Sequence, residues 1–225
     1  MNRQTGFSLI ELLVVISLIA TLSGLTAFSL KGNSGAVKLS TGGWQLASLF
    51  DSARETAILR QKPVAIVLLA SGDEVANRVF TVLGYVSPAT PGEAGQWKQI
   101  SRWETLPQGV LVDTGVDSSG NALVAFTSSG SVTLNTYTTL PSLTYRGLSY
   151  AAKDQYGYVI IMPDGSLYQD ASGALPSPCV LRLVEGIRQG VGTRRTGQKN
   201  GDGNAANYFE IVFIQATGRT KIIRS

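Results

Sequence analysis

The stretch GFSLIELLVVISLIATLSGLTAFSL, residues 6–30, determines how this chain is organised. Apolar residues dominate residues 7–30, and the only ionisable side chain among them is Glu11. A helix of about 24 residues is about 36 Å long, which is enough to cross a hydrocarbon core of about 30 Å. A lone carboxylate inside such a span is costly unless a partner satisfies it. The pattern therefore predicts a membrane-spanning helix in which Glu11 has a specific role.

The leader in front of this span differs from that of an ordinary secreted protein. A secretory signal has basic residues first, then a short apolar region, and then a cleavage site of small residues. Here the basic residue is Arg3, the apolar segment is long, and the small residue Gly6 precedes it. The alternative is a plain signal anchor that contains Gly6 and Glu11 by coincidence.

The sequence GFSLIELLVVISLIA, residues 6–20, resembles the N-terminal motif of the type IV pilin and pseudopilin family. The resemblance implies that a prepilin peptidase removes the leader, residues 1–6, by cutting between Gly6 and Phe7, and that Phe7 is then methylated. It also implies that Glu11 pairs with the N-terminal amine of a neighbouring subunit, because a buried charge is tolerated beside an opposite one. Alternatively, Glu11 reaches the membrane interface. If it pairs, we expect Glu11→Ala to be processed and inserted but not assembled.

The topology follows from the same segment. Arg3 is expected to stay in the cytoplasm, since basic residues flanking a span favour that side. The chain would then be a single-pass protein of the inner (cytoplasmic) membrane, with its globular domain in the periplasm, until it enters a filament. Its expected partners are the prepilin peptidase, the inner membrane before assembly, and other pilins or pseudopilins that contact its N-terminal helix.

Residues 44–225 have the pattern of one globular α+β domain. Before them, residues 31–43 contain four glycines and predict a linker or a helix break. Residues 44–61 repeat apolar side chains at three- and four-residue spacing and predict an amphipathic helix, which Pro63 ends. After Pro63 the apolar period changes to two, which predicts antiparallel strands covered on one sheet face by this helix. The expected strands and hairpins lie at residues 64–70, 79–86, 97–103, 122–137, 158–169, 179–185 and 207–224.

The order of several motifs in this domain resembles the GspH/FimT group of minor pseudopilins and minor pilins. The resemblance implies two small sheets packed on the helix and a position at or near a filament tip. Two segments depart from the pattern, the stretch 138–156 and the glycine-rich loop before the last hairpin. The motifs are LFDSARETAILRQKPVAIVL at 49–68, LPQGVLV at 106–112, MPDGSL at 162–167 and TGRTK at 217–221.

Composition argues against an enzyme. The chain has no histidine, which excludes Ser-His-Asp and Cys-His catalysis and histidine-dependent zinc sites. Its one cysteine, Cys179, leads a strand-like run, is interpreted as a small buried residue, and has no partner for an intramolecular disulfide. Nucleotide-binding glycine motifs are also missing from the sequence. We therefore expect neither an enzyme nor a cofactor or metal site, and a membrane-anchored hydrolase would need two carboxylates sharing a cleft.

Basic residues concentrate near the C-terminus. Residues 182–225 contain eight basic and three acidic residues, a net charge of +5 in a chain whose total is +4. Residues 188–203 have the composition of a solvated loop, and arginines on such a loop neutralise phosphates without reading sequence. In FimT-type minor pilins a Gly-Arg-x-basic motif contributes to DNA capture, and residues 218–221 resemble it. The candidate DNA-binding residues are Arg194, Arg195, Lys199, Arg219 and Lys221.

Two functions follow from these patterns. The first is a minor pseudopilin of a type II secretion-like pseudopilus, assembled after prepilin peptidase cleavage. The alternative is a minor pilin of a type IV pilus with a DNA-binding or DNA-uptake role through its basic C-terminal region. If the basic residues only keep the surface soluble, the DNA-binding role disappears, whereas the assembly role does not depend on them.

Overall fold

A computed structural model describes residues 8–69, 77–90, 95–113, 140–150, 156–168, 179–189, 192–195, 206–214 and 216–224. The chain forms two compact units, Met1–Val37 and Lys38–Ser225. The predicted processing site at Gly6 and Phe7 lies outside the described residues, and so do Lys199 and the predicted hairpin at 122–137.

Helix α1 spans Leu9–Arg60 and ends where expected, because Gln61 has a positive φ of 53° shortly before Pro63. Residues 31–43, where a linker or helix break was expected, are included in α1, and the boundary between the two units falls within them. Each glycine inside a helix costs about 1 kcal/mol relative to alanine. Packing offsets that cost at Gly43, where a Cβ would overlap the ring of Phe209, and at Gly42, where it would lie 3.2 Å from Cδ of Pro107.

The first sheet has the strand order β3-β2-β1-β8, with β4 paired to β2. All its pairings are antiparallel, and Val64 at the start of β1 is in register with Gly84 on one side and Ile161 on the other. The predicted strands at 64–70 and 79–86 are confirmed. The return after the PDG turn is only a single bridge between Ile161 and Leu167. The strands are β1 Val64–Leu69, β2 Val79–Val86, β3 Gln96–Gln99, β4 Glu104–Thr105 and β8 Tyr156–Ile161.

The second sheet has the order β10-β9-β11-β12, with β5 paired to β9. The predicted last hairpin is confirmed as β11 and β12, whereas the loop expected over 188–203 instead contains the end of β9 and all of β10. A separate pair, β6 Leu143–Tyr145 and β7 Leu148–Tyr150, lies in the segment that departs from the family pattern. The strands of the second sheet are β5 Val110–Val112, β9 Cys179–Gln189, β10 Gly192–Arg195, β11 Tyr208–Ile214 and β12 Arg219–Arg224.

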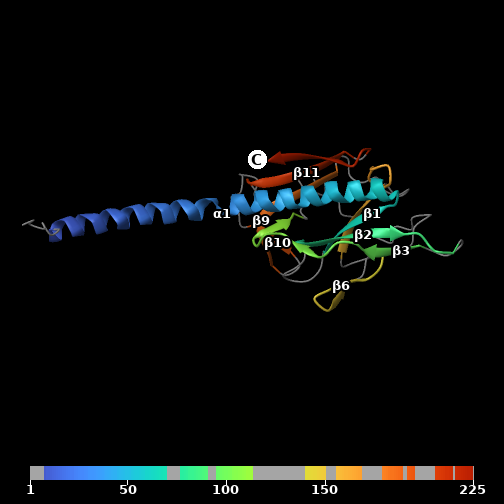
Figure 1. Cartoon of the computed structure of the whole chain (residues 1–225), viewed down its shortest axis with the longest axis horizontal. Helices are drawn as coiled ribbons and strands as arrows, with labels where there is room; N and C mark the ends of the chain where they lie inside the picture. Colours follow the sequence, from blue (N-terminus) through green and yellow to red (C-terminus); the bar gives the residue numbers. More distant parts are fainter. Residues whose placement is uncertain are drawn as a thin grey trace, which may run out of the picture. The chain divides into compact units, whose positions relative to one another are not determined.

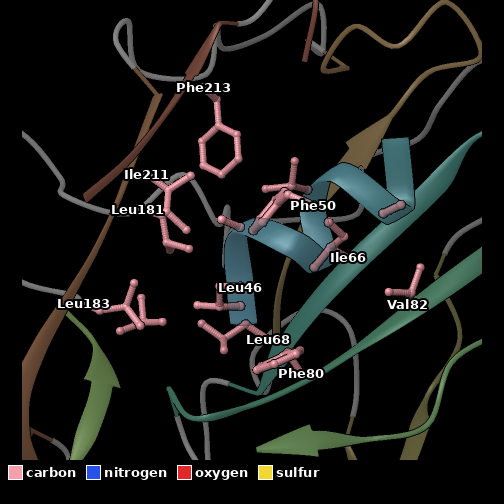
Figure 2. Close-up of a cluster of buried hydrophobic side chains, with 14 of the residues drawn as sticks. Leu46, Phe50, Ile66, Leu68, Phe80, Val82, Leu181, Leu183, Ile211 and Phe213 are labelled. Carbon is pink, nitrogen blue, oxygen red and sulfur yellow. The ribbon is translucent and has the colours of Figure 1, made fainter. Parts of the chain in front are cut away.

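Within the second unit, the main core lies between α1 and both sheets (Figure 1). Figure 2 shows Leu46 and Phe50 of α1 between side chains of the first sheet, such as Ile66, and side chains of the second sheet, such as Leu181. The ring centroid of Phe50 lies 4.5 Å from that of Phe213. One helix thus buries a face of each of two antiparallel sheets, which confirms the predicted α+β class and the predicted pair of sheets on the helix.

The opposite face of the first sheet carries a second core, which is rich in aromatic residues. The β6–β7 hairpin contributes to it, and Trp103 donates its indole N–H to the carbonyl oxygen of Thr144 at 3.0 Å. The tyrosine hydroxyl of Tyr156 donates to the carbonyl oxygen of Pro141 at 2.6 Å. Burial raises the pKa of Tyr156, and neighbouring Tyr158 raises it further. Both faces of the first sheet are therefore covered.

Candidate functional site

The start of α1 places Glu11 in a reciprocal cap with Ser8. The backbone N–H of Ser8 donates to Oε2 of Glu11 at 3.1 Å, and the backbone N–H of Glu11 donates to Oγ of Ser8 at 3.3 Å. This arrangement is a capping box, which satisfies two of the N–H groups left unpaired at a helix start. A negative charge in the first turn is also favoured by the helix dipole. Glu11 therefore has a local role in the single chain, which the sequence interpretation did not include.

The first part of α1, residues 9–23, is largely apolar and exposed on all sides. Ten large apolar side chains between Leu9 and Leu22 are exposed by 49–84%. A helix that is apolar all round is typical of one that is buried among other chains or in lipid, and exposed apolar surface of this extent requires a cover. The residues are Leu9, Ile10, Leu12, Leu13, Val14, Val15, Ile16, Leu18, Ile19 and Leu22. In the part of the chain that the structure describes, no helix combines the length and the apolar character needed to cross a membrane.

The predicted basic residues lie in two different places. Arg219 and Lys221 are exposed and alternate along β12, so they share one face of the sheet. Arg194 and Arg195 lie in β10, where Arg194 pairs with Ile187 near the end of β9.

Strand register separates these two pairs of basic residues. Lys221 is in register with Val212, which pairs with Val180 of β9. From Val180 to Ile187, the partner of Arg194, is seven positions, or about 23 Å along an extended strand at about 3.3 Å per residue. Of the predicted DNA-binding residues that the structure describes, Arg219 and Lys221 share a face of β12, whereas Arg194 and Arg195 are successive residues of β10.

Two other cations of the C-terminal region interact within the domain. Arg182 donates from Nε to Oε1 of Glu210 at 2.6 Å across β9 and β11, and a second guanidinium nitrogen pairs with the same oxygen. The Arg182 guanidinium also lies over the ring of Tyr208, 4.6 Å from its centroid. Part of the positive charge counted in the sequence is therefore balanced by Glu210.

Arg224 stacks on aromatic rings. Its guanidinium carbon lies 5.0 Å from the ring centroid of Trp44 and 5.4 Å from that of Phe209, within the range of cation–π attraction. Trp44 is on α1 and Arg224 is near the end of β12, so this contact joins the last strand to the helix. Trp44 and Arg224 are 180 positions apart in the sequence, and no rule of sequence spacing predicts a contact between them.

The TGRTK motif takes part in a junction with the helix and with the MPDGSL motif. Arg54 of α1 donates from Nε to the carbonyl oxygen of Thr217 at 2.7 Å, and Thr220 donates its hydroxyl to Oδ1 of Asp51 at 3.3 Å. Gly218 has a φ of 61° and is packed so closely that a Cβ there would overlap the carbonyl oxygen of Gly165. In this structure, the glycine of the Gly-Arg-x-basic pattern is therefore required by the fold.

The MPDGSL turn is closed by Asp164. Oδ1 of Asp164 accepts the hydroxyl of Ser166 at 2.7 Å and the backbone N–H of Ser166 at 2.9 Å. These two hydrogen bonds hold the pKa of Asp164 below its ordinary value, and the bond from the hydroxyl has the larger effect. Over the described residues, no group of three or more potential metal-binding side chains is found. Asp164 thus serves the turn that supports Gly218.

Comparison with known protein families gives two matches. Residues 1–27 match the prokaryotic N-terminal methylation motif, and residues 44–173 match the type II transport protein GspH. The search of curated proteins found none that matches. Among solved structures, the chain is similar to the minor pseudopilin EpsH of the type 2 secretion system of Vibrio cholerae, with 13% identity and a TM-score of 0.38. That alignment covers 83% of this chain and 95% of the other.

Proposed function

The chain belongs to the family of the type II transport protein GspH, and from that premise we propose that it is a minor pseudopilin of a type II secretion pseudopilus. The observation that carries the proposal is the order of features along the chain. A methylation motif comes first, then an exposed and largely apolar helical segment, and then a domain in which the same helix packs on two antiparallel sheets. The role is structural, and the proposal assigns no reaction to the chain.

Processing precedes assembly in this proposal. Prepilin peptidase cuts between Gly6 and Phe7, and the new amine at Phe7 is methylated. Before assembly, the segment 7–30 holds the chain in the inner membrane, with Arg3 of the uncut precursor in the cytoplasm and the globular domain in the periplasm. After extraction, the apolar surface of this segment packs against other pseudopilins.

Glu11 then exchanges one partner for another. In the single chain its carboxylate caps Ser8, an interaction typically worth about 1 kcal/mol. Inside a filament, an unpaired carboxylate in an apolar environment costs several times more than that cap contributes. The methylated amine of a neighbouring Phe7 removes this cost, since it places a positive charge beside Glu11.

The test uses the full chain in a bacterium that has a type II secretion system and lacks its own GspH-family subunit. Mass spectrometry of the N-terminus reports processing, and co-purification with sheared filaments reports assembly. We expect Gly6→Ala to remain uncut, and Glu11→Ala to be cut and methylated but absent from filaments. Glu55→Ala, an exposed acid farther along the same helix, is the matched control and should assemble normally. Secretion restored by an uncut chain would refute the proposal, and normal assembly of Glu11→Ala would refute the pairing.

The alternative of a DNA-binding minor pilin has less support, because the candidate residues that the structure describes lie on two separate strands, β10 and β12. It is tested by a gel shift of the detergent-solubilised full chain on duplex DNA at low and moderate salt. A shift that is lost when Arg219 and Lys221 are replaced would favour this alternative. If no shift occurs at low salt, the DNA-binding hypothesis is wrong.

A further inference from the structure

Of the strands that the structure describes, β12 lies at an edge of the second sheet. Among the described strands it pairs only with β11, and Figure 1 shows it as the red strand lying outside β11. An edge strand presents a row of backbone N–H and C=O groups to which an extended segment of another protein can be added. Strand β12 has six residues and is largely exposed, whereas the edge strands of the first sheet are either shorter, as β3 with four residues, or buried, as β8 with six.

The position of β12 is fixed by contacts at both of its ends. At one end, Arg54 binds the carbonyl oxygen of Thr217, and at the other, Arg224 stacks on Trp44. Between them, the hydroxyl of Thr220 donates to Asp51. A strand that is already ordered loses little conformational freedom when a partner binds, which favours association.

The exposed side chains of β12 determine which partner fits. Arg219, Lys221 and Ile223 alternate along the strand on the face away from α1, and neither cation forms an ion pair with a described residue. Two such rows of cations repel each other, so β12 of a second copy is a poor partner. An extended segment with carboxylates at alternate positions places a negative charge opposite each cation, and Ile223, 37% exposed, offers an apolar contact beside them.

We propose that β12 is a docking edge for an extended acidic segment of another subunit, which adds to the second sheet as a further strand. Main-chain hydrogen bonds to β12 hold the segment, and its carboxylates lie opposite Arg219 and Lys221. That the partner is a filament subunit rests on the proposed function, whereas the acidic strand chemistry rests on β12 alone.

The first experiment measures binding of fluorescent heptapeptides to the detergent-solubilised full chain at moderate salt. The probe is a peptide of alternating glutamate and valine. One control peptide has lysine in place of glutamate, and another has a methyl group on every backbone nitrogen, which blocks strand pairing at both of its edges and keeps the charge. We expect only the first peptide to bind. Equal binding of the methylated peptide, or equal binding of a short DNA duplex, would mean that charge alone acts and would overturn the proposal.

Charge reversal locates the binding edge. The paired substitution Arg219→Glu with Lys221→Glu turns two attractive cross-strand pairs into repulsive ones, and we expect about tenfold weaker binding of the acidic peptide. The same variant should gain affinity for the lysine peptide. The matched control, Lys98→Glu with Arg102→Glu, changes two exposed cations at and next to β3 and should leave binding unchanged. If both double variants lose binding equally, the edge of β12 is not the site.

The same variants separate this inference from the proposed function. If the chain restores secretion and enters filaments but binds no acidic peptide, the docking edge is refuted and the function stands. If the chain binds the acidic peptide but never enters filaments, the acidic strand chemistry stands and the filament partner is refuted. Normal filament entry by the Arg219→Glu, Lys221→Glu variant refutes the proposal that filament subunits use this edge.

Discussion

The carbonyl oxygen of Gly165 occupies the space in which a side chain on Gly218 would begin. Around this contact, Arg54 of α1 reaches the carbonyl oxygen of Thr217, the residue before Gly218. The turn after β8 and the turn between β11 and β12 therefore meet beside the helix. This junction fixes the position of the last hairpin. It joins two motifs that are far apart in the sequence, since Gly165 belongs to MPDGSL and Gly218 to TGRTK.

Gly218→Ala should destabilise the domain more than Gly109→Ala. Gly109 also has a positive φ, of 86°, but no atom lies within 4 Å of a Cβ placed there. The Gly109 variant therefore measures the backbone cost alone, about 1–2 kcal/mol. The Gly218 variant adds an overlap with backbone, which we expect to raise the loss by about 1–3 kcal/mol. Urea unfolding followed by tryptophan fluorescence measures both losses, and equal losses would contradict the close contact.

Gly43→Ala should also destabilise the domain, although alanine favours helix formation. The added methyl group overlaps the ring of Phe209, and the expected net loss is about 1–2 kcal/mol after the gain of about 1 kcal/mol in helix propensity. In a Phe209→Leu background the ring is gone, so the same substitution should cost much less. The free energies of unfolding of the four proteins in this cycle give the coupling, and additive effects would contradict the overlap.

Removing one member of the Arg182–Glu210 pair should destabilise the domain strongly, whereas replacing both members with apolar residues should change its stability little. Their side chains are 18% and 11% exposed. Glu210→Ala leaves a largely buried guanidinium without its carboxylate, and we expect a loss of about 3 kcal/mol. The joint change Arg182→Met with Glu210→Leu should stay within about 1 kcal/mol of the native protein. Urea unfolding measures the loss of stability in both variants. An equally large loss would show that the ion pair itself stabilises the sheet, and that the cost of Glu210→Ala does not come only from leaving Arg182 unpaired.

Asp164 should make a small pH-dependent contribution to stability in the acid range. Because its pKa is lower in the folded chain than in the unfolded chain, this contribution is fully present above the unfolded value. It is lost as the pH falls through the folded value. Ser166→Ala removes the hydroxyl donor and should move the pKa of Asp164 back toward its ordinary value. An NMR titration of the Asp164 carboxyl carbon measures the shift, and an unchanged pKa would assign the effect to the backbone donor.

The regular parts of the fold were predictable from local patterns. The short apolar segments after Pro63 predicted β1 and β2 correctly, because strands that are buried on both faces are apolar along their length. The GspH-family motifs predicted two sheets on the helix. The helical conformation at Gly43 was not predictable, because a glycine looks like a helix breaker until Phe209 is placed against it.

Other errors have similar causes. The β6–β7 hairpin has strands of only three residues, and Arg146 adopts a φ of 50° where asparagine or aspartate is the usual turn residue. The dispersal of the basic residues depends on the length and register of β9, which alternation alone does not give. The sequence singles out Glu11 by its charge, but the cap that it forms with Ser8 depends on where the helix starts.

The core between α1 and the second sheet also determines when the domain can finish folding. Phe209 and Phe213 from the last hairpin complete the core around Leu46 and Phe50, which are made much earlier. Contacts between such distant parts of a chain form late, because a long loop must close first. During synthesis, the side of the helix that packs on the second sheet therefore stays uncovered until almost the whole polypeptide has emerged. A chain shortened before residue 208 should accordingly be recognised by chaperones and proteases as unfinished.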